Sequence, residues 1–323
     1  MNLIQACDRI LKNNMCLSKN ERLLIIKDHT KLEIANAFQT AGDKICENVS
    51  VVDIPPLEFN GMEPPENASE AMLDADVIMV GTSSSLSWTN ARENATKNGA
   101  RLASMSRVTE EMLIRTAQTN YTEVRIRVNL IADFIDRSSQ VRIISDAGTN
   151  IVFSIEDRKA HGRSGGVYDA PGKWGNIPCG EAFMAPVERT ADGIYVVNGS
   201  QAGVGLLDKP IRISVRDGFA TNIGGGKKAD EFRGMLERVG DKNAFAIAEF
   251  GIGANDKAIL SGVTLEDEKV FGTCHIALGR NDLFGGSINV GVHVDGVLRA
   301  PTIYFDDELF MEKGKIVIDK RIN

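Results

Sequence analysis

The first third of the chain alternates between short apolar runs and segments whose apolar residues recur at helical spacing. The apolar runs, which predict buried strands, are residues 23–26, 49–54, 77–80 and 101–104. The helically spaced segments are residues 3–11, 32–38, 87–98 and 109–115, and a polar, proline-rich stretch at 55–67 separates the second strand from the third. Because strands and helices alternate, we expect an open, mostly parallel sheet. Residues 1–118 are therefore predicted to form a Rossmann-like α/β domain.

From about residue 120 the pattern changes to strands of alternating apolar residues punctuated by glycine. These strands are residues 141–144, 193–197, 211–215 and 315–318. The dipeptides Asp192-Gly193 and Asp217-Gly218 are typical of hairpin turns, and one helix, residues 229–239, interrupts the strands. We expect a β-rich α+β domain over residues 119–323, so the predicted fold class is α/β with two domains, the second of which carries the metal site.

Composition and charge narrow the class of protein. With 323 residues the chain exceeds the size at which one hydrophobic core usually stops growing, which also favours two domains. Its 43% hydrophobic and 25% charged residues are ordinary for a soluble globular protein, and no apolar run approaches the ~18 to 20 residues of a membrane span. The net charge of −7, without a Lys/Arg stripe, argues against nucleic acid and favours a small-molecule or short peptide substrate.

The start of the chain and its cysteines predict a compartment. Residues 1–9 lack a basic segment followed by an apolar one, so we expect a cytoplasmic protein that is not attached to a membrane. The five cysteines include no C-x-x-C pair, which argues against a disulfide framework and against a structural zinc knuckle. Reduced thiols are therefore expected.

Two of the four histidines lie close together near the C-terminus, in segments that are predicted to be strands. Side chains at i and i+2 leave the same face of a strand, so His293 and Asp295 would point in one direction. His275 would complete a triad. Two histidines and one carboxylate are the ligand set of non-haem iron, and with further carboxylates they would suit a two-metal hydrolytic centre.

Simpler explanations exist for the same residues. Asp295-Gly296 is a common hairpin dipeptide, and its aspartate could serve a turn alone. His275 could be a packed or hydrogen-bonded core histidine. Cys274 would point to the opposite face of the strand that carries His275, so we expect it to pack and not to bind metal.

Two glutamates stand in apolar surroundings. Glu181 lies among small and apolar residues, and Glu249 ends an apolar strand. A carboxylate in such surroundings needs a cation or a proton, although each could instead be an edge residue that reaches solvent. With the two histidines and the aspartate they would make five ligands, enough to hold two divalent ions ~3.5 to 4 Å apart.

Four segments carry a resemblance to a known family. They are residues 175–186 (GNIPCGEAFMAP), 249–251 (EFG), 275–279 (HIALG) and 293–295 (HVD). In order and spacing the series resembles the aminopeptidase T family of metallopeptidases. The resemblance implies a two-domain subunit, a homodimer and a cocatalytic metal pair. It also implies which residues bind that pair, namely Glu181, Glu249, His275, His293 and Asp295.

Asp282 departs from the family pattern. The aminopeptidases have a catalytic tyrosine seven residues beyond the first histidine, and this chain has Asp282 there. Such a tyrosine would help to stabilise a tetrahedral oxyanion. A relative of similar architecture, the 2,5-dihydroxypyridine dioxygenase, opens an aromatic ring with one iron held by two histidines and an aspartate. The triad in this chain would serve that reaction equally well.

The main prediction is a metallohydrolase that cleaves an N-terminal aminoacyl or related amide bond. One or two Zn, Co or Mn ions would activate water, and Glu181 could accept the proton instead of binding metal. Residues just beyond the metal strand, Arg280, Asn281 and Asp282, are predicted to lie at the substrate. Arg280 or Asn281 could bind a substrate carboxylate or oxyanion, although either could simply be an exposed loop residue.

Two other functions are considered. The alternative is an Fe(II) ring-cleaving dioxygenase of the 2,5-dihydroxypyridine dioxygenase type, with Glu181 and Glu249 as acid/base groups beside the iron. A third hypothesis is a decayed site in a ligand-binding or assembly protein. It is disfavoured because all five candidate ligands are present.

Overall fold

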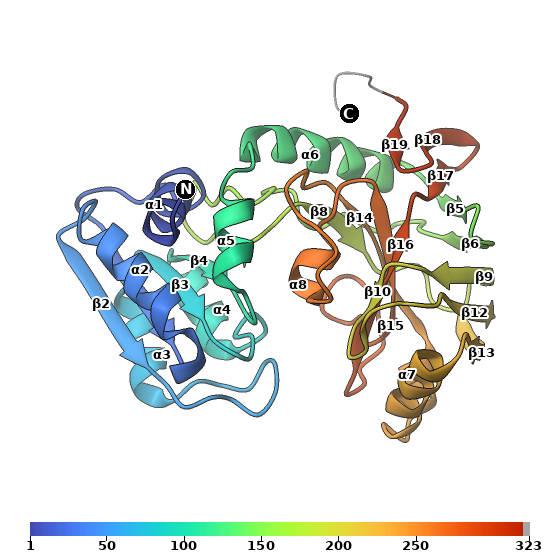
Figure 1. Cartoon of the computed structure of the whole chain (residues 1–323), viewed down its shortest axis with the longest axis horizontal. Helices are drawn as coiled ribbons and strands as arrows, with labels where there is room; N and C mark the ends of the chain where they lie inside the picture. The colour runs from blue at the N-terminus through green and yellow to red at the C-terminus, as the bar shows by residue number, and fades with distance from the viewer. Residues whose placement is uncertain (319–323) are drawn as a thin grey trace. The chain divides into compact units, whose positions relative to one another are not determined.

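The chain divides into two compact units. A computed structural model describes residues 1–318 (Figure 1). Unit 1 comprises Met1–Arg125 and Ser164–Cys179, and unit 2 comprises Ile126–Arg163 and Gly180–Asn323. The chain thus passes between the units three times, whereas the sequence pattern predicted one boundary after residue 118. The return segment supplies an edge strand to the sheet of unit 1, and no local pattern reports a pairing between residues so far apart.

Unit 1 is built on a parallel sheet of five strands within the described residues, in the order β2-β1-β3-β4-β7. The strands are β1 (Arg22–Lys27), β2 (Asn48–Asp53), β3 (Val77–Gly81), β4 (Arg101–Ser104) and β7 (Trp174–Asn176). Its helices are α1 (Leu3–Asn13), α2 (Leu32–Gly42), α3 (Glu66–Asp74), α4 (Asn90–Lys97) and α5 (Glu110–Thr116), with a short 3₁₀ turn at His29–Lys31. This arrangement confirms the predicted Rossmann-like α/β class.

Local chemistry explains where these helices begin. Asn2 caps α1 by accepting the Gln5 amide, and the Gln5 side chain accepts the Asn2 amide in return. Threonines cap α4 and α5 in the same way. Helix α3 follows Pro65 inside the region where the sequence analysis placed no helix. It buries Ala68 and Met72, four residues apart on one face, and this single apolar pair is too short a pattern to stand out.

Unit 2 contains two larger, largely antiparallel sheets in the part of the chain that is described. The six-stranded sheet runs β11-β10-β16-β15-β14-β8, and the eight-stranded sheet runs β13-β12-β9-β6-β5-β17-β18-β19. The strands of the first sheet are β8 (Glu181–Met184), β10 (Ser200–Gln201), β11 (Gly205–Leu206), β14 (Ile247–Gly253), β15 (Thr273–Gly279) and β16 (His293–Arg299). The strands of the second are β5 (Gln140–Ile144), β6 (Asn150–Ser154), β9 (Asp192–Val197), β12 (Ile211–Arg216), β13 (Phe219–Gly224), β17 (Thr302–Phe305), β18 (Glu308–Glu312) and β19 (Lys315–Ile316). The predicted β-rich character is confirmed.

The expectation of a single helix after residue 120 is wrong. The predicted helix is present as α7 (Lys227–Glu237), which packs on β12 and β13 (Figure 1). Two more helices are α6 (Tyr121–Arg137) and α8 (Thr264–Asp267), and a 3₁₀ turn covers Lys242–Phe245. Helix α6 buries apolar residues at helical spacing, namely Val124, Val128, Ile131 and Ile135. The helical spacing is therefore present in the sequence, and the prediction of strands from about residue 120 onward overlooks it.

One of the two predicted hairpins forms. Asp217 and Gly218 both have positive φ, 49° and 77°, and join β12 to β13 as a primed turn requires. Asp192-Gly193 instead opens β9, where Gly193 pairs with Ile151. A Cβ at Gly193 would lie 2.3 Å from a backbone oxygen, so this glycine serves close strand packing and the turn prediction is wrong. Among the described residues no helix is both long and apolar enough to cross a membrane.

A buried ion pair fastens the start of unit 1 to its sheet. The Arg101 guanidinium donates to both carboxylate oxygens of Glu21, at 2.8 and 3.0 Å, and to the Met15 carbonyl at 3.0 Å. The Arg101 side chain is only 10% exposed. Burial raises the pKa of Glu21, but the hydrogen bonds from Arg101 and Ser18 outweigh it, and the pKa is lowered.

We predict that Glu21→Ala lowers the free energy of unfolding by about 1–3 kcal/mol, because it leaves the buried Arg101 without its carboxylate. Urea unfolding followed by circular dichroism measures the change. Glu47→Ala is the control, since the Lys19–Glu47 pair is more than 70% exposed on both sides and should contribute little. Equal losses in both variants would contradict the assignment.

Candidate metal centre

Five predicted ligands lie on one face of the six-stranded sheet of unit 2. The strand register places Glu249, Ala277 and Asp295 in one row across β14, β15 and β16. His275 pairs with Gly251 in the next row, and the other two candidates are Glu181, opposite Gly253, and His293, opposite Gly279. Paired residues share a face, and so do residues two apart along a strand. The register therefore brings together residues that are far apart in the sequence.

The five side chains form a continuous series of contacts. The Nε2 atom of His275 lies 3.1 Å from Glu249 Oε1 and 3.4 Å from Glu181 Oε2. The Nε2 atom of His293 lies 3.4 Å from Glu249 Oε2 and 3.6 Å from Asp295 Oδ1. Both imidazoles thus face the same carboxylate, that of Glu249. His275 is fully buried, and the three carboxylates are 7% exposed or less.

The donor atoms are arranged to hold a cation. The Nδ1 atom of His293 lies 2.7 Å from the Arg280 carbonyl, so it donates there and leaves its Nε2 lone pair facing carboxylates. One donor atom each from Glu249, His293 and Asp295 lies within 4.8 Å of the others. Asp295 Oδ1 and Glu181 Oε2 are buried without a hydrogen-bond partner in the described part of the chain. Orphaned carboxylate oxygens beside imidazole nitrogens fit a metal ion, and the cluster can hold one.

The pKa values report the same demand for positive charge. Burial lowers the pKa of His275, but Glu249 and Glu181 outweigh it and raise the pKa to about 9. Burial and Asp295 likewise oppose each other at His293, whose pKa is raised well above its usual value. Burial raises the pKa of Glu249, but the two histidines outweigh this effect and lower the pKa to about 2. Because a bound divalent ion supplies that charge in place of the imidazole protons, metal binding would release protons.

Small residues make room on this face. A Cβ on Gly251 would lie 2.2 Å from His275 Nε2, although the backbone of Gly251 is not in the left-handed region. The glycine is therefore required by space and not by conformation. Ala277 likewise separates Glu249 from Asp295 in their row.

The structure rules out the turn explanation for Asp295 and the edge-residue explanation for the two glutamates. Asp295 and Gly296 both lie inside β16, so the hairpin-turn explanation of the aspartate is wrong. Cys274 is fully buried on the other face of β15, which confirms that it packs, and burial raises the pKa of its thiol. Glu181 and Glu249 are buried and do not reach solvent as edge residues would.

The three residues predicted to lie at the substrate form a tightly bonded loop. The Arg280 guanidinium pairs with Asp282 at 2.5 Å, and Asp282 also accepts from Asn289. Asn281 is fully buried; its amide nitrogen donates to Glu188, and its oxygen accepts the Ile288 amide. The structure thus shows what these side chains bind within the protein, and their contact with substrate stays a prediction.

Sequence reasoning missed two polar residues beside the centre, Lys269 and His161. Lys269 is fully buried and donates to Glu181 at 2.7 Å and also to Glu268. It ends the run Glu266-Asp267-Glu268-Lys269, a charge pattern that is more typical of an exposed surface. His161 lies far from His275 and His293 in the sequence, yet its backbone bridges to Phe183 and its ring stacks on that of Phe183 at 5.4 Å.

A series of ring contacts begins at His293. Phe284 packs edge-on against the His293 imidazole with ring centroids 5.3 Å apart. Phe183 packs edge-on against Phe284 at 5.9 Å, and it shares the face that carries the ligands because it lies two residues beyond Glu181 on β8. These rings, together with His161, give the centre an aromatic border.

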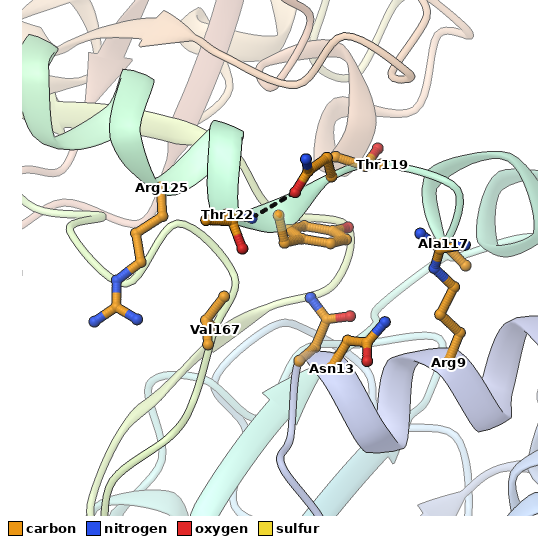
Figure 2. Close-up of a pocket in the computed structure, with 10 residues that line it drawn as sticks. Arg9, Asn13, Ala117, Thr119, Thr122, Arg125 and Val167 are labelled. Atoms are coloured by element: carbon orange, nitrogen blue, oxygen red, sulfur yellow. Dashed lines mark hydrogen bonds between the residues drawn. The ribbon is translucent and has the colours of Figure 1, made fainter.

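A polar hollow of about 410 Å³ lies elsewhere, in unit 1, and contains none of the ligand candidates. Figure 2 shows Arg9, Asn13 and Arg125 around it, with the Thr122 amide donating to the side-chain oxygen of Asn120. Arg125 is already paired with Asp169 at 2.9 Å. No carboxylate or imidazole is among the residues that line this hollow.

Comparison with known structures agrees with this fold. The two-unit arrangement of a parallel sheet and antiparallel sheets is similar in fold to aminopeptidase T. Wild-type AmpT from Thermus thermophilus matches with a TM-score of 0.72 at 16% identity, over 98% of this chain and 99% of that one. The structure of 2,5-dihydroxypyridine dioxygenase from Pseudomonas putida KT2440 matches with a TM-score of 0.84 at 21% identity, over 99% and 98% of the two chains.

The sequence comparisons show the family. The model of the 2,5-dihydroxypyridine 5,6-dioxygenase (NicX) family matches residues 2–318, and the chain belongs to this family. The 2,5-dihydroxypyridine 5,6-dioxygenase of Pseudomonas putida is 24% identical over 348 residues, covering 98% of this chain and 96% of that protein.

The main functional prediction, a metallohydrolase of the aminopeptidase type, is therefore wrong. The family is one of dioxygenases, which are oxidoreductases, and the likeness to AmpT is one of fold. The error has a physical reason, because both chemistries need histidines and carboxylates on the same strands, and the order of those residues does not separate them. The informative difference was Asp282, which stands where the aminopeptidases have tyrosine.

We predict that Gly251→Ala weakens metal binding by roughly 10- to 100-fold, because the added Cβ displaces the His275 imidazole. Metal content after dialysis against a graded chelator measures the affinity, and circular dichroism checks that the fold is kept. Gly291→Ala is the matched control, since its Cβ would meet nothing within 4 Å. Unchanged affinity in Gly251→Ala would show that His275 does not contribute to the site.

Proposed function

We propose that the protein is an Fe(II)-dependent ring-cleaving dioxygenase that acts on a dihydroxypyridine, 2,5-dihydroxypyridine being the first candidate. The observation that carries the proposal is a pair of histidines that both face the Glu249 carboxylate, with Asp295 and the Phe284 ring against His293, in a chain of this family. Such a donor set is characteristic of non-haem Fe(II) oxygenases. The rings of Phe183 and Phe284 beside the donor atoms suit a flat aromatic substrate better than a peptide.

The proposed ligands are His275, His293 and Asp295. Glu249 contacts both imidazoles through its two oxygens, and so keeps both Nε2 atoms directed at the same region. The Arg280 carbonyl holds the tautomer of His293 in which Nε2 is free to bind a metal. When bound, ferrous iron supplies the activation of O₂ that a closed-shell aromatic ring requires.

The remaining side chains bind and orient the substrate in this proposal. Phe183 and Phe284 contact the ring and exclude water from the reacting carbons. His161 stacks on Phe183 and lies near enough to Glu249 for that charge to act on it, so it can accept the proton of a ring hydroxyl. Both atoms of O₂ enter the product, and no external reductant is consumed.

The direct test is oxygen uptake. Protein loaded anaerobically with Fe(II) should consume one O₂ for each 2,5-dihydroxypyridine, with loss of the aromatic ultraviolet absorbance, and His293→Ala should lose both iron and activity. An oxygen electrode and a spectrophotometer measure the two quantities together. The proposal is contradicted if iron-loaded protein consumes no oxygen with any dihydroxypyridine.

We predict that Phe183→Leu raises KM for the pyridine about 2- to 10-fold with a smaller effect on kcat, because it removes an aromatic contact of about 0.5–1.5 kcal/mol. Steady-state kinetics on iron-replete enzyme separates the two constants. Phe59→Leu is the control, since this ring is 60% exposed in unit 1. A loss confined to kcat would place Phe183 away from the substrate.

A further inference from the structure

Lys269 holds one of the carboxylates of the metal centre, and its burial is unusual. The side chain is 0% exposed, and its ammonium contacts Glu181 Oε1 at 2.7 Å and the Glu268 carboxylate. A buried lysine stays charged only when carboxylates surround it. Glu181 and Glu268 place two carboxylates against the Lys269 ammonium. The ammonium is therefore a fixed positive charge beside the centre.

Backbone contacts place the Lys269 ammonium beside the centre. Lys269 follows α8, its amide donates to the Glu266 carbonyl, and its own carbonyl accepts the Asn255 amide. At this point the segment runs directly against β14, because a Cβ on Gly253 would lie 2.1 Å from the Val270 carbonyl oxygen. Gly253 is the residue that pairs with Glu181 across β14 and β8. A glycine in that row lets Lys269 come within hydrogen-bond distance of Glu181.

The contact divides the two oxygens of Glu181 between two tasks. Oε1 accepts from Lys269, and Oε2 faces His275 Nε2 at 3.4 Å with no hydrogen-bond partner among the described residues. Glu181 therefore presents a single oxygen to the centre, whereas a carboxylate that bridges a metal pair uses both. The position where a second cation would meet Glu181 is filled by an ammonium.

Charge counting agrees with this division. Glu181, Glu249 and Asp295 carry three negative charges on the ligand face when ionised. One divalent ion and Lys269 together supply three positive charges. Glu268 is a fourth carboxyl, and it also lies against the ammonium. A second divalent ion would leave the buried site with excess positive charge.

We propose that the Lys269 ammonium takes the place of a second metal ion, so that the centre binds one divalent ion and Glu181 is a positioned carboxylate beside it. Lys269 is a positioning residue, since it acts through Glu181. The inference rests on the proposed function for its chemical setting, but it concerns the number of ions and not the reaction.

The test is metal stoichiometry, with Mn(II) as the probe. Apo-protein is equilibrated with excess Mn(II), passed through a desalting column and analysed for metal per chain, and ions that remain on His293→Ala are subtracted. Wild type should bind one ion, and Lys269→Met should bind two because Glu181 is then free to bind metal with both oxygens. Lys269→Arg keeps the charge and should bind one.

Two results would overturn the inference. The first is a second ion in wild type that disappears in Glu181→Gln, and the second is a folded Lys269→Met that still binds one ion with unchanged affinity. If Lys269→Met does not fold, the comparison of wild type with Glu181→Gln decides, because the inference requires one ion in both. Oxygen uptake by the iron-loaded wild type is measured separately. One ion without oxygen uptake would refute the proposed function alone, and two ions with oxygen uptake would refute only the role of Lys269.

Discussion

Three buried carboxylates on one face of a β-sheet are the constraint on which the rest of this site depends. Glu181, Glu249 and Asp295 are nearly inaccessible to water, and an unpaired ionised carboxylate in such a position is costly. Two imidazoles that share Glu249 and a buried ammonium lie against them, and the donor atoms are close enough together to hold a metal ion. The raised pKa values of His275 and His293 express the same requirement.

The sheet accommodates the three carboxylates through its strand register and through small residues at the positions between them. Glycines at 251 and 253 and an alanine at 277 occupy the positions between the charged residues, and side chains there would displace His275 or keep Lys269 away. Such positions weaken a strand, since glycine contributes no packing and costs conformational entropy. The chain therefore gives up some strand stability in order to assemble a polar site within a sheet.

One fold with the same ligand types carries different reactions, and the surroundings of the ligands decide between them. The likeness to AmpT extends along almost the whole chain, yet the family is that of a dioxygenase. Beside the donors of this chain lie Asp282 bonded to Arg280, the Phe284 ring against His293, and an ammonium against Glu181. These features change the available charge and the shape of the substrate that fits, without any change of fold.

The local pattern by itself predicted the α/β character of unit 1, the β-rich character of unit 2 and the charged side chains that the strand register brings together. Periodicity identified nearly every strand and helix of unit 1, and residues two apart on a strand correctly placed His293 and Asp295 on one face. Helices α3, α6 and α8, the insertion of β7 and several strands of unit 2 were missed, because their signals were overlain by another pattern, too short, or non-local. Only the tertiary structure brought His161 to Phe183 and buried Lys269 against Glu181, since 88 residues separate that pair and a run of charges normally faces water. Charge balance in a buried site depends on which groups meet in space, and that is decided by strand register across the sheet and not by order along the chain.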